Sequence, residues 1–112
     1  MNQSTRDASE VAAKLFHGFA DQTRMGILLC LLDGEHRVTD LVDHTGRSQA
    51  TVSEHIACLR GCGLVESRTE GRQSFYRLAS REVIDVLMAA QHLLAATGET
   101  VRLCPAHLVP KR

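Results

Sequence analysis

Residues 48–63, SQATVSEHIACLRGCG, decide the fold of this 112-residue chain. They open with Ser48, whose hydroxyl can accept a hydrogen bond from the free backbone N–H groups of a first helical turn. Val52, Ile56 and Leu59 follow at positions i, i+4 and i+7, which places them on one face of an α-helix. The run therefore predicts an amphipathic helix whose apolar face packs on a core.

The polar face of this helix predicts contact with nucleic acid. Ser48, Gln49, Ser53 and Arg60 are polar or cationic side chains that suit base edges and phosphates in a major groove. Residues 47–77 carry 5 basic and 3 acidic side chains, whereas the whole chain carries 13 of each sign. The molecule therefore has no net field to attract DNA, but its positive excess is centred on the segment that holds this helix.

A shorter helix precedes this one. Residues 37–45 carry an apolar face and end at Gly46, only a few residues before the next helix begins. A tight turn that contains glycine thus joins the two helices, which is the helix-turn-helix arrangement.

A β-hairpin is predicted to follow. Residues 64–69 and 74–78 have the composition of strands, and the turn between them contains a glycine that can adopt positive φ. A hairpin in this position is a wing. Its cations for phosphate or minor-groove contact are Arg68, Arg72 and Arg77, although ordinary surface arginines are nearly as good an explanation.

Helices are expected near both ends of the chain. Residues 1–8 predict a flexible polar arm, and Ser9 is the candidate cap of a helix that runs to about residue 20. Asp21 or Thr23 can cap the helix that follows.

The last helix is expected between Ser80 and Gly98. Its apolar side chains cover more than half of its circumference, which exceeds what one small core can bury. Part of that surface is therefore expected to pack on a second chain. The tail beyond it has no regular pattern, but it contains Cys104 and His107.

Composition limits the class of protein. With 44% apolar and 23% charged residues, the chain predicts one globular domain. It shows no targeting segment and no apolar run near the ~18 residues of a membrane span, so a cytoplasmic location is expected. Its 4 cysteines then predict thiols, with Cys30 as a small buried side chain. No pattern for a nucleophile beside a base, a phosphate loop or a redox Cys-x-x-Cys occurs, so an enzyme is not expected.

Five short motifs lie along the chain, and these are Phe19-Ala20-Asp21-Gln22-Thr23-Arg24, Thr51-Val52-Ser53-Glu54-His55-Ile56, Gly63-Leu64-Val65, Glu70-Gly71-Arg72 and Tyr76-Arg77-Leu78. Together they resemble the ArsR/SmtB family of winged-helix repressors over about residues 9–97. Gln22 departs from the proline that is usual in the family, which alters a helix start and not the assignment.

The resemblance implies a mainly α fold with a small β-hairpin (α+β), a winged helix-turn-helix that forms a homodimer through its terminal helices. It implies a DNA-binding and dimerisation domain at residues 9–98 and a tail, residues 99–112, that contributes a metal ligand. Such proteins bind operator DNA when metal-free and release it when metal binds. Thr51, Glu54 and His55 join the candidate DNA contacts, and His55 is expected to pack or face DNA and not to hold metal.

The metal ligands differ between members of this family, so each known ligand pattern is compared with this sequence residue by residue. The third helix has Arg37-Val38-Thr39-Asp40 in place of a Cys-x-Cys, and Asp85 and His92 do not match the zinc spacing of the last helix. Cys58, Cys62 and Cys104 instead resemble the cadmium- and lead-sensing members, in which two cysteines at the end of the recognition helix and one from the tail form the site.

The chemistry of these residues agrees with that resemblance. Cys58 and Cys62 are one helical turn apart, so their sulfurs can converge on one ion if Cys62 is helical, which the neighbouring glycines leave open. Thiolates favour Cd(II) and Pb(II), allow Zn(II) and exclude Mg(II). Cys104 would be the third ligand, within or across protomers, and His107 or water would complete Cd(II).

Two alternatives stay open at this point. In the first alternative, Cys58 and Cys62 are packing residues of a repressor that senses a signal other than metal. The same fold could act as a thiol redox sensor, although two cysteines four residues apart in a regular helix meet disulfide geometry poorly.

Overall fold

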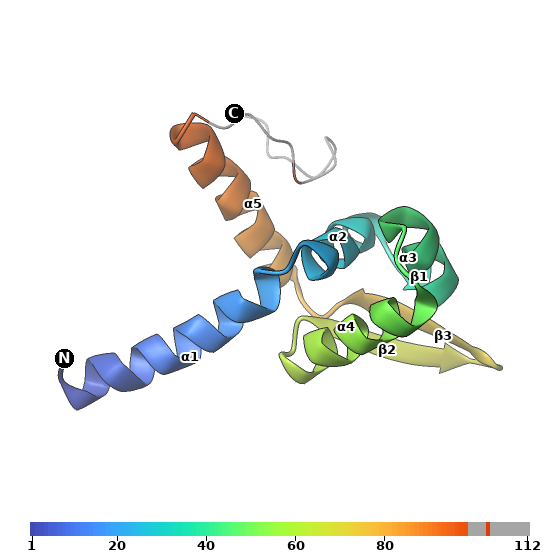
Figure 1. Ribbon diagram of the computed structural model, residues 1–112, viewed down its shortest axis with the longest axis horizontal. Helices are drawn as coiled ribbons and strands as arrows, with labels where there is room; N and C mark the ends of the chain where they lie inside the picture. Colours follow the sequence, from blue (N-terminus) through green and yellow to red (C-terminus); the bar gives the residue numbers. More distant parts are fainter. Residues whose placement is uncertain (99–102, 104–112) are drawn as a thin grey trace.

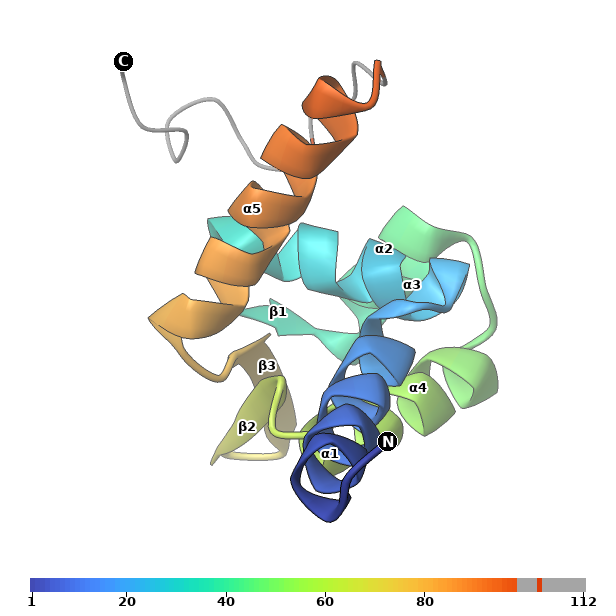
Figure 2. The same ribbon diagram turned by 90° about the vertical axis from the view of Figure 1, so that its left-hand side faces the viewer.

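The computed structural model describes residues 1–98 and 103 of the chain. The described elements are α1 (Gln3–Phe19), α2 (Gln22–Cys30), the 3-10 helix η1 (Leu31–Asp33), β1 (His36–Arg37), α3 (Val38–Thr45), α4 (Gln49–Gly61), β2 (Val65–Glu70), β3 (Gln73–Leu78) and α5 (Arg81–Ala96). The body consists of α2, α3, α4 and the sheet, while α1 and α5 project from it (Figures 1 and 2). The predicted winged helix-turn-helix is therefore confirmed.

The core lies among the three helices of the body and the first half of α5, which contributes Val83, Leu87 and Met88. Val52, Ile56 and Leu59 of α4 are buried as their spacing predicted, and they belong to one cluster with Ile27 of α2 and Leu41 of α3. Full burial of one such side chain contributes about 1.5–3 kcal/mol, so three on one face fix which side of α4 remains outside.

The sheet has three antiparallel strands in the order β1-β3-β2. The wing is the hairpin of β2 and β3, in which Val65 pairs with Leu78 and Glu70 pairs with Gln73. The turn requires Gly71, whose φ is 62°. Strand β1 was not predicted, because two residues carry no detectable alternation. It pairs with β3 and thereby joins the start of α3 to the wing.

The junction of α1 and α2 shows what the first motif does. Asp21 caps α2, because its carboxylate accepts a hydrogen bond from the Arg24 N–H at 3.0 Å. The Arg24 side chain turns back to α1, where Nε and Nη2 donate to the carbonyl oxygens of Gly18 at 3.1 Å and His17 at 2.9 Å. Phe19, the last residue of α1, is buried. The motif thus ends one helix and starts the next, with Asp21 and not Thr23 as the cap.

The prediction for residues 1–8 is wrong at the level of secondary structure. Helix α1 begins at Gln3 and not after Ser9, because Asn2 caps it by accepting a hydrogen bond from the Thr5 N–H at 2.8 Å. Of the large apolar side chains of α1, only Phe19 reaches the core, whereas Val11, Leu15 and Phe16 are exposed.

Three smaller features complete the fold. Ser80 stands at the N-cap position of α5, but its hydroxyl makes no capping hydrogen bond. Gly98 follows α5 with a φ of 95°, as expected of a residue that ends a helix. Among the described residues, no helix combines the length and apolar character needed to cross a membrane.

Candidate nucleic-acid interface and metal ligands

The start of α4 is fixed by two hydroxyl groups. Ser48 is the N-cap, and its Oγ accepts a hydrogen bond from the Thr51 N–H at 3.2 Å. The same hydroxyl donates to Thr51 Oγ1 at 2.9 Å. Both side chains are thereby engaged in holding the helix start, which positions the residues that follow.

The remaining candidate DNA-contacting residues of α4 differ in their exposure. Gln49, Ser53, Glu54 and Arg60 are exposed, as DNA-contacting side chains have to be. His55 is half-buried, and its Nε2 lies 3.8 Å from the carboxylate of Asp21 at the start of α2. That histidine therefore connects α4 with α2, a packing role that is one of the two expected for it, and its DNA contact stays a prediction.

A hollow lies between the helix-turn-helix and the wing. It brings together three predicted residues, Gln49, Ser53 and Arg72, from α4 and the hairpin turn. The same hollow contains residues that the sequence reasoning did not single out, because nothing in the local pattern links the start of α3 to β3. These additional polar residues are Arg37, Thr39, Gln73, Ser74 and Tyr76.

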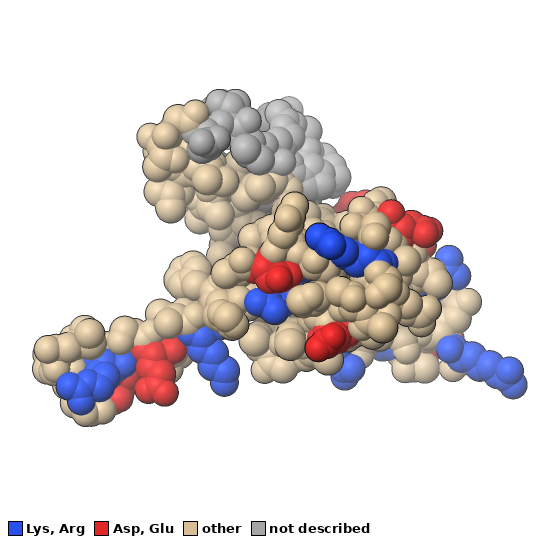
Figure 3. All heavy atoms as spheres, in the orientation of Figure 1, with Lys and Arg blue, Asp and Glu red and all other residues tan. Residues whose placement is uncertain are grey.

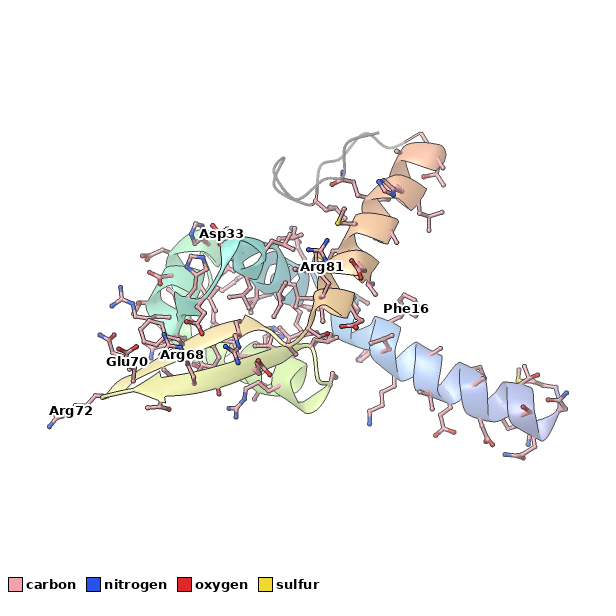
Figure 4. All side chains as sticks on the ribbon, turned by 180° about the vertical axis from the view of Figure 1, so that it is seen from behind. Phe16, Asp33, Arg68, Glu70, Arg72 and Arg81 are labelled. Atoms are coloured by element: carbon pink, nitrogen blue, oxygen red, sulfur yellow. The ribbon has the colours of Figure 1, made fainter. Side chains whose placement is uncertain are left out.

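The three predicted cations of the wing have different surroundings, and Arg77 forms an ion pair with Glu66 at 2.6 Å. Arg68 forms ion pairs with Glu35 at 2.9 Å and Glu70 at 2.8 Å, and its guanidinium lies 4.7 Å from the centre of the Phe75 ring. The hydrogen bonds from Arg68 hold the pKa of Glu35 below its usual range, and the two carboxylates raise the pKa of Arg68. Arg72 extends from the tip of the wing away from the body (Figure 4).

The C-terminal end of α4 forms a Schellman motif. The N–H of Leu64 donates to the carbonyl oxygen of Leu59 at 2.9 Å, and the N–H of Gly63 donates to Arg60 at 3.1 Å. Gly63 has a φ of 75°, which only glycine adopts without strain. Cys62 is the C-cap residue, and its N–H donates to the carbonyl oxygen of Cys58 at 3.0 Å. The two cysteines therefore remain one turn apart although the helix ends at Gly61.

The side chains of these two cysteines differ in exposure. Cys58 is exposed, whereas Cys62 is half-buried and lines a hollow with Val11, Lys14 and Leu15 of α1. Cys104 and His107, the other predicted ligands, lie outside the described residues. Within the part of the chain that the structure describes, no three metal-ligating side chains come together. The structure thus places two of the proposed thiol ligands and not the complete set.

Cys30 has a different environment. It is half-buried beside the core, and burial raises the pKa of its thiol, with a smaller contribution from Asp33. A thiol that is partly removed from water in this way is a poorer ligand and nucleophile, which agrees with the packing role expected for it.

Comparison with known proteins identifies the family. Residues 21–67 match the model described as bacterial regulatory protein, arsR family. The transcriptional regulator CmtR of Mycobacterium tuberculosis is 43% identical over 91 residues, which cover 81% of this chain and 69% of the relative. A probable mercury resistance operon repressor of Streptomyces lividans is 35% identical, covering 85% of this chain and 76% of its own.

A solved structure agrees with the sequence relatives. The homodimeric winged helix-turn-helix DNA-binding domain of a possible ArsR-family regulator from Mycobacterium bovis has a TM-score of 0.68 at 28% identity, covering 85% of this chain and 93% of that one. The relatives and the fold are those of transcription regulators and not of enzymes. This chain therefore belongs to the arsR family of bacterial regulatory proteins.

Proposed function

We propose that the protein is a cytoplasmic, metal-responsive transcriptional repressor. A homodimer binds operator DNA when metal-free and dissociates when Cd(II) or Pb(II) binds through Cys58, Cys62 and Cys104, with Zn(II) as a further candidate inducer. The observation that carries the proposal is the construction of α4, which has exposed polar side chains in its first turns and two cysteines at its end. The mercury resistance relative supports a metal as the signal.

The homodimer is supported by apolar surface on both terminal helices. Val11 is 72% exposed, Phe16 is 60% exposed and Leu93 of α5 is 67% exposed. Phe16 projects outward from α1 (Figure 4), and the part of α5 visible in Figure 3 carries no charged side chain. On α1, Val11 and Leu15 line one hollow, and an exposed apolar patch on a monomer is a mark of association. A second copy that covers both helices would bury it, as the homodimeric relative suggests.

The DNA-contacting face consists of the start of α4 and the wing tip. Gln49 and Ser53 are exposed on α4 and stand beside Arg72 in one hollow, which suits a helix that enters a major groove while the wing follows the backbone. In a dimer with twofold symmetry, the two α4 helices would face successive grooves about 34 Å apart.

The proposed metal site is supported by the chemistry and spacing of its ligands. Cys58 and Cys62 supply two soft sulfur donors, and the hydrogen bond between their main chains keeps them one turn apart. Two thiolates bind a metal ion weakly, so a third from Cys104 is required, and His107 is a candidate fourth. Thiolate ligands select Cd(II) and Pb(II) over oxygen-preferring ions such as Mg(II).

The position of Cys62 suggests how metal would act on DNA binding. Cys62 faces α1, which carries part of the proposed dimer surface, and it also follows directly on the DNA-contacting helix α4. A ligand that draws Cys62 and the tail together would therefore change the angle between α1 and α4. Each 1.4 kcal/mol of coupling weakens operator affinity about tenfold and weakens metal binding to the DNA complex by the same factor.

The test is fluorescence anisotropy of a palindromic fragment from the protein's own promoter, with reduced protein at fixed salt. We expect tight binding that Cd(II) or Pb(II) abolishes. Cys58→Ser should keep DNA binding and lose the release. Cys30→Ser is the matched control, since Cys30 packs beside the core, and it should respond to metal as the wild type does.

Two outcomes would contradict the proposal. Release of the Cys58→Ser variant by Cd(II) would show that the thiol site is wrong. If the wild type binds DNA tightly and no metal changes this binding, the cysteines have packing or redox roles and not a metal-sensing role. Thiol titration before and after peroxide would then decide between those two roles.

A further inference from the structure

The hollow between α3, α4 and the wing has the lining of an anion site. Its walls come from three elements that are distant in the sequence, with Arg37 and Thr39 at the start of α3, Ser53 on α4, and Arg72 and Ser74 on the wing. We propose that this hollow binds one phosphate of the operator backbone. The inference rests on the proposed function and adds Arg37, Thr39 and Ser74, which the five sequence motifs do not contain.

The hydroxyl groups of the hollow are available for a ligand. Thr39, Ser53, Ser74 and Tyr76 make no side-chain hydrogen bond within residues 1–98 and 103, although all four line the same hollow. Each hydroxyl has one donor to offer, and such groups are regular partners of DNA phosphate oxygens. A set of unused donors on three facing elements is therefore suited to a phosphodiester.

The charged side chains that line the hollow are all positive. None of the residues that line the hollow is acidic, and two of them are arginines, Arg37 and Arg72. Arg37 forms an ion pair with Asp40, with 3.7 Å between Arg37 Nε and Asp40 Oδ2, and the same carboxylate accepts a hydrogen bond from the Arg37 main-chain N–H at 3.0 Å. Because 3.7 Å is too long for a hydrogen bond, the N–H donors of the Arg37 guanidinium remain available to a phosphate that joins this ion pair.

Arg68 of the wing differs from Arg37 and Arg72, because its guanidinium is already hydrogen-bonded. Its donors contact two carboxylates, those of Glu35 and Glu70, at 2.8–2.9 Å, so a phosphate would have to displace them. Arg72, by comparison, forms no ion pair with any residue that the structure describes. The structure therefore assigns phosphate contact to Arg37 and Arg72.

A phosphate at this place would position α4 on the DNA. Gln49 and Ser53 line the same hollow and lie on the face of α4 that is proposed to meet the bases. Backbone contacts set the register of a protein on a duplex and carry no base information themselves. Loss of the contact should consequently weaken binding to every sequence by the same factor.

The experiment measures how DNA affinity depends on salt for the wild type and for Arg37→Gln. Arg37→Gln removes one phosphate contact from each protomer, so the magnitude of the slope of log K against log salt should fall by about 1.8 for the dimer, at about 0.9 per contact. The advantage of the wild type over the variant should thus shrink about twelvefold between about 50 and about 200 mM salt. The same loss is expected on the operator and on random DNA of equal length.

Arg81→Gln is the matched control. Arg81 is exposed and lies near a carboxylate of its own helix, Asp85 at 3.3 Å, but it belongs to α5 outside the hollow. Its removal changes the net charge equally and should leave the slope unchanged. The Arg37 main chain caps α3, so the Arg37→Gln side chain should not unfold the helix, and thermal melting checks this.

A second measurement observes the hollow directly. The chain has a single tyrosine, Tyr76, so 3-fluorotyrosine labelling yields one fluorine resonance from the lining. DNA should shift that resonance in the wild type and shift it less in Arg37→Gln.

The outcomes separate this inference from the function on which it rests. Binding of DNA by the wild type with equal slopes for Arg37→Gln and Arg81→Gln would overturn the phosphate contact alone. A fluorine resonance that DNA leaves unchanged would do the same. If the wild type binds neither operator nor random DNA, the proposed function fails and the contact fails with it.

Discussion

The thiol of Cys62 packs against the main chain of Gly18, so that a Cβ on Gly18 would lie 3.6 Å from Cys62 Sγ and 3.2 Å from Leu64 Cδ1. This contact joins the end of α4 to the end of α1. The helix that carries the proposed DNA contacts and the helix that carries exposed apolar surface therefore meet at a proposed metal ligand. A change at Cys62 is placed to act on both helices.

The first prediction concerns this close approach. Gly18→Ala should destabilise the protein by about 1 kcal/mol, because the cost of about 1–3 kcal/mol for crowding the buried Leu64 exceeds the gain of about 1 kcal/mol from alanine within α1. Gly61→Ala is the control, since nothing lies within 4 Å of its added Cβ and alanine is the better helix former. Urea denaturation should show opposite signs for the two variants. Equal stability of Gly18→Ala and the wild type would mean that the contact is loose.

The second prediction concerns the glycine after α4. Gly63→Ala should cost about 1–2 kcal/mol, because its positive φ brings a Cβ against the neighbouring carbonyl oxygen. Gly63→Asn should cost less, since asparagine tolerates this conformation better. Cd(II) affinity should fall along with stability in Gly63→Ala, since the same turn positions Cys62. Unchanged metal affinity in a destabilised Gly63→Ala variant would separate the turn from the site.

The third prediction distinguishes two arginines of the wing. Arg72→Gln should lower the magnitude of the salt slope of DNA binding by about 1.8 for the dimer, because each protomer loses one guanidinium that pairs with no described carboxylate and is proposed to contact phosphate. Arg68→Gln should leave the slope unchanged, because Glu35 and Glu70 already neutralise Arg68. Glu35→Gln should raise the slope by freeing Arg68 for phosphate. Anisotropy titrations at several salt concentrations measure all three, and a drop in slope for Arg68→Gln would make it a direct contact.

The fourth prediction is a pH dependence that Asp21 causes. The hydrogen bond from the Arg24 N–H, with a smaller effect of His55, holds the pKa of Asp21 below its usual value and outweighs desolvation. A folded-state pKa below the unfolded one stabilises the fold above the unfolded value, and that stability is lost as pH falls through the folded value. As the pH is lowered, the urea midpoint of Asp21→Asn should therefore decrease less than that of the wild type. The helix keeps a good N-cap in this variant, because asparagine caps as well as aspartate. Asp85→Asn, which caps no helix, should follow the wild type.

The fifth prediction tests the homodimer. Phe16→Glu should shift sedimentation toward the monomer and weaken operator binding, because a charge would enter the proposed apolar interface. Thr69→Glu adds the same charge on the exposed wing and should leave the dimer intact. A monomeric wild type would contradict the proposed association through the terminal helices.

The sequence predicted α4 well, because a helix of this kind is encoded by neighbouring residues. Ser48 as the N-cap, the buried face of Val52 and Leu59, and Gly63 beyond the end all follow from spacing along one segment. The start of α1 was predicted wrongly, because Asn2 is as good a cap as Ser9 and several polar residues separate the two.

The sequence by itself determined the helices, the wing and the family, since these rest on local periodicity, caps and short motifs. Only the tertiary structure decided which charged side chains are engaged, because Glu35 and Arg68 are 33 residues apart and meet through the sheet. The same holds for the hollow that joins Arg37 to Arg72 and for the contact of Cys62 with Gly18. Local patterns fix which face of an element is apolar, whereas packing of distant elements fixes which polar groups remain free to bind.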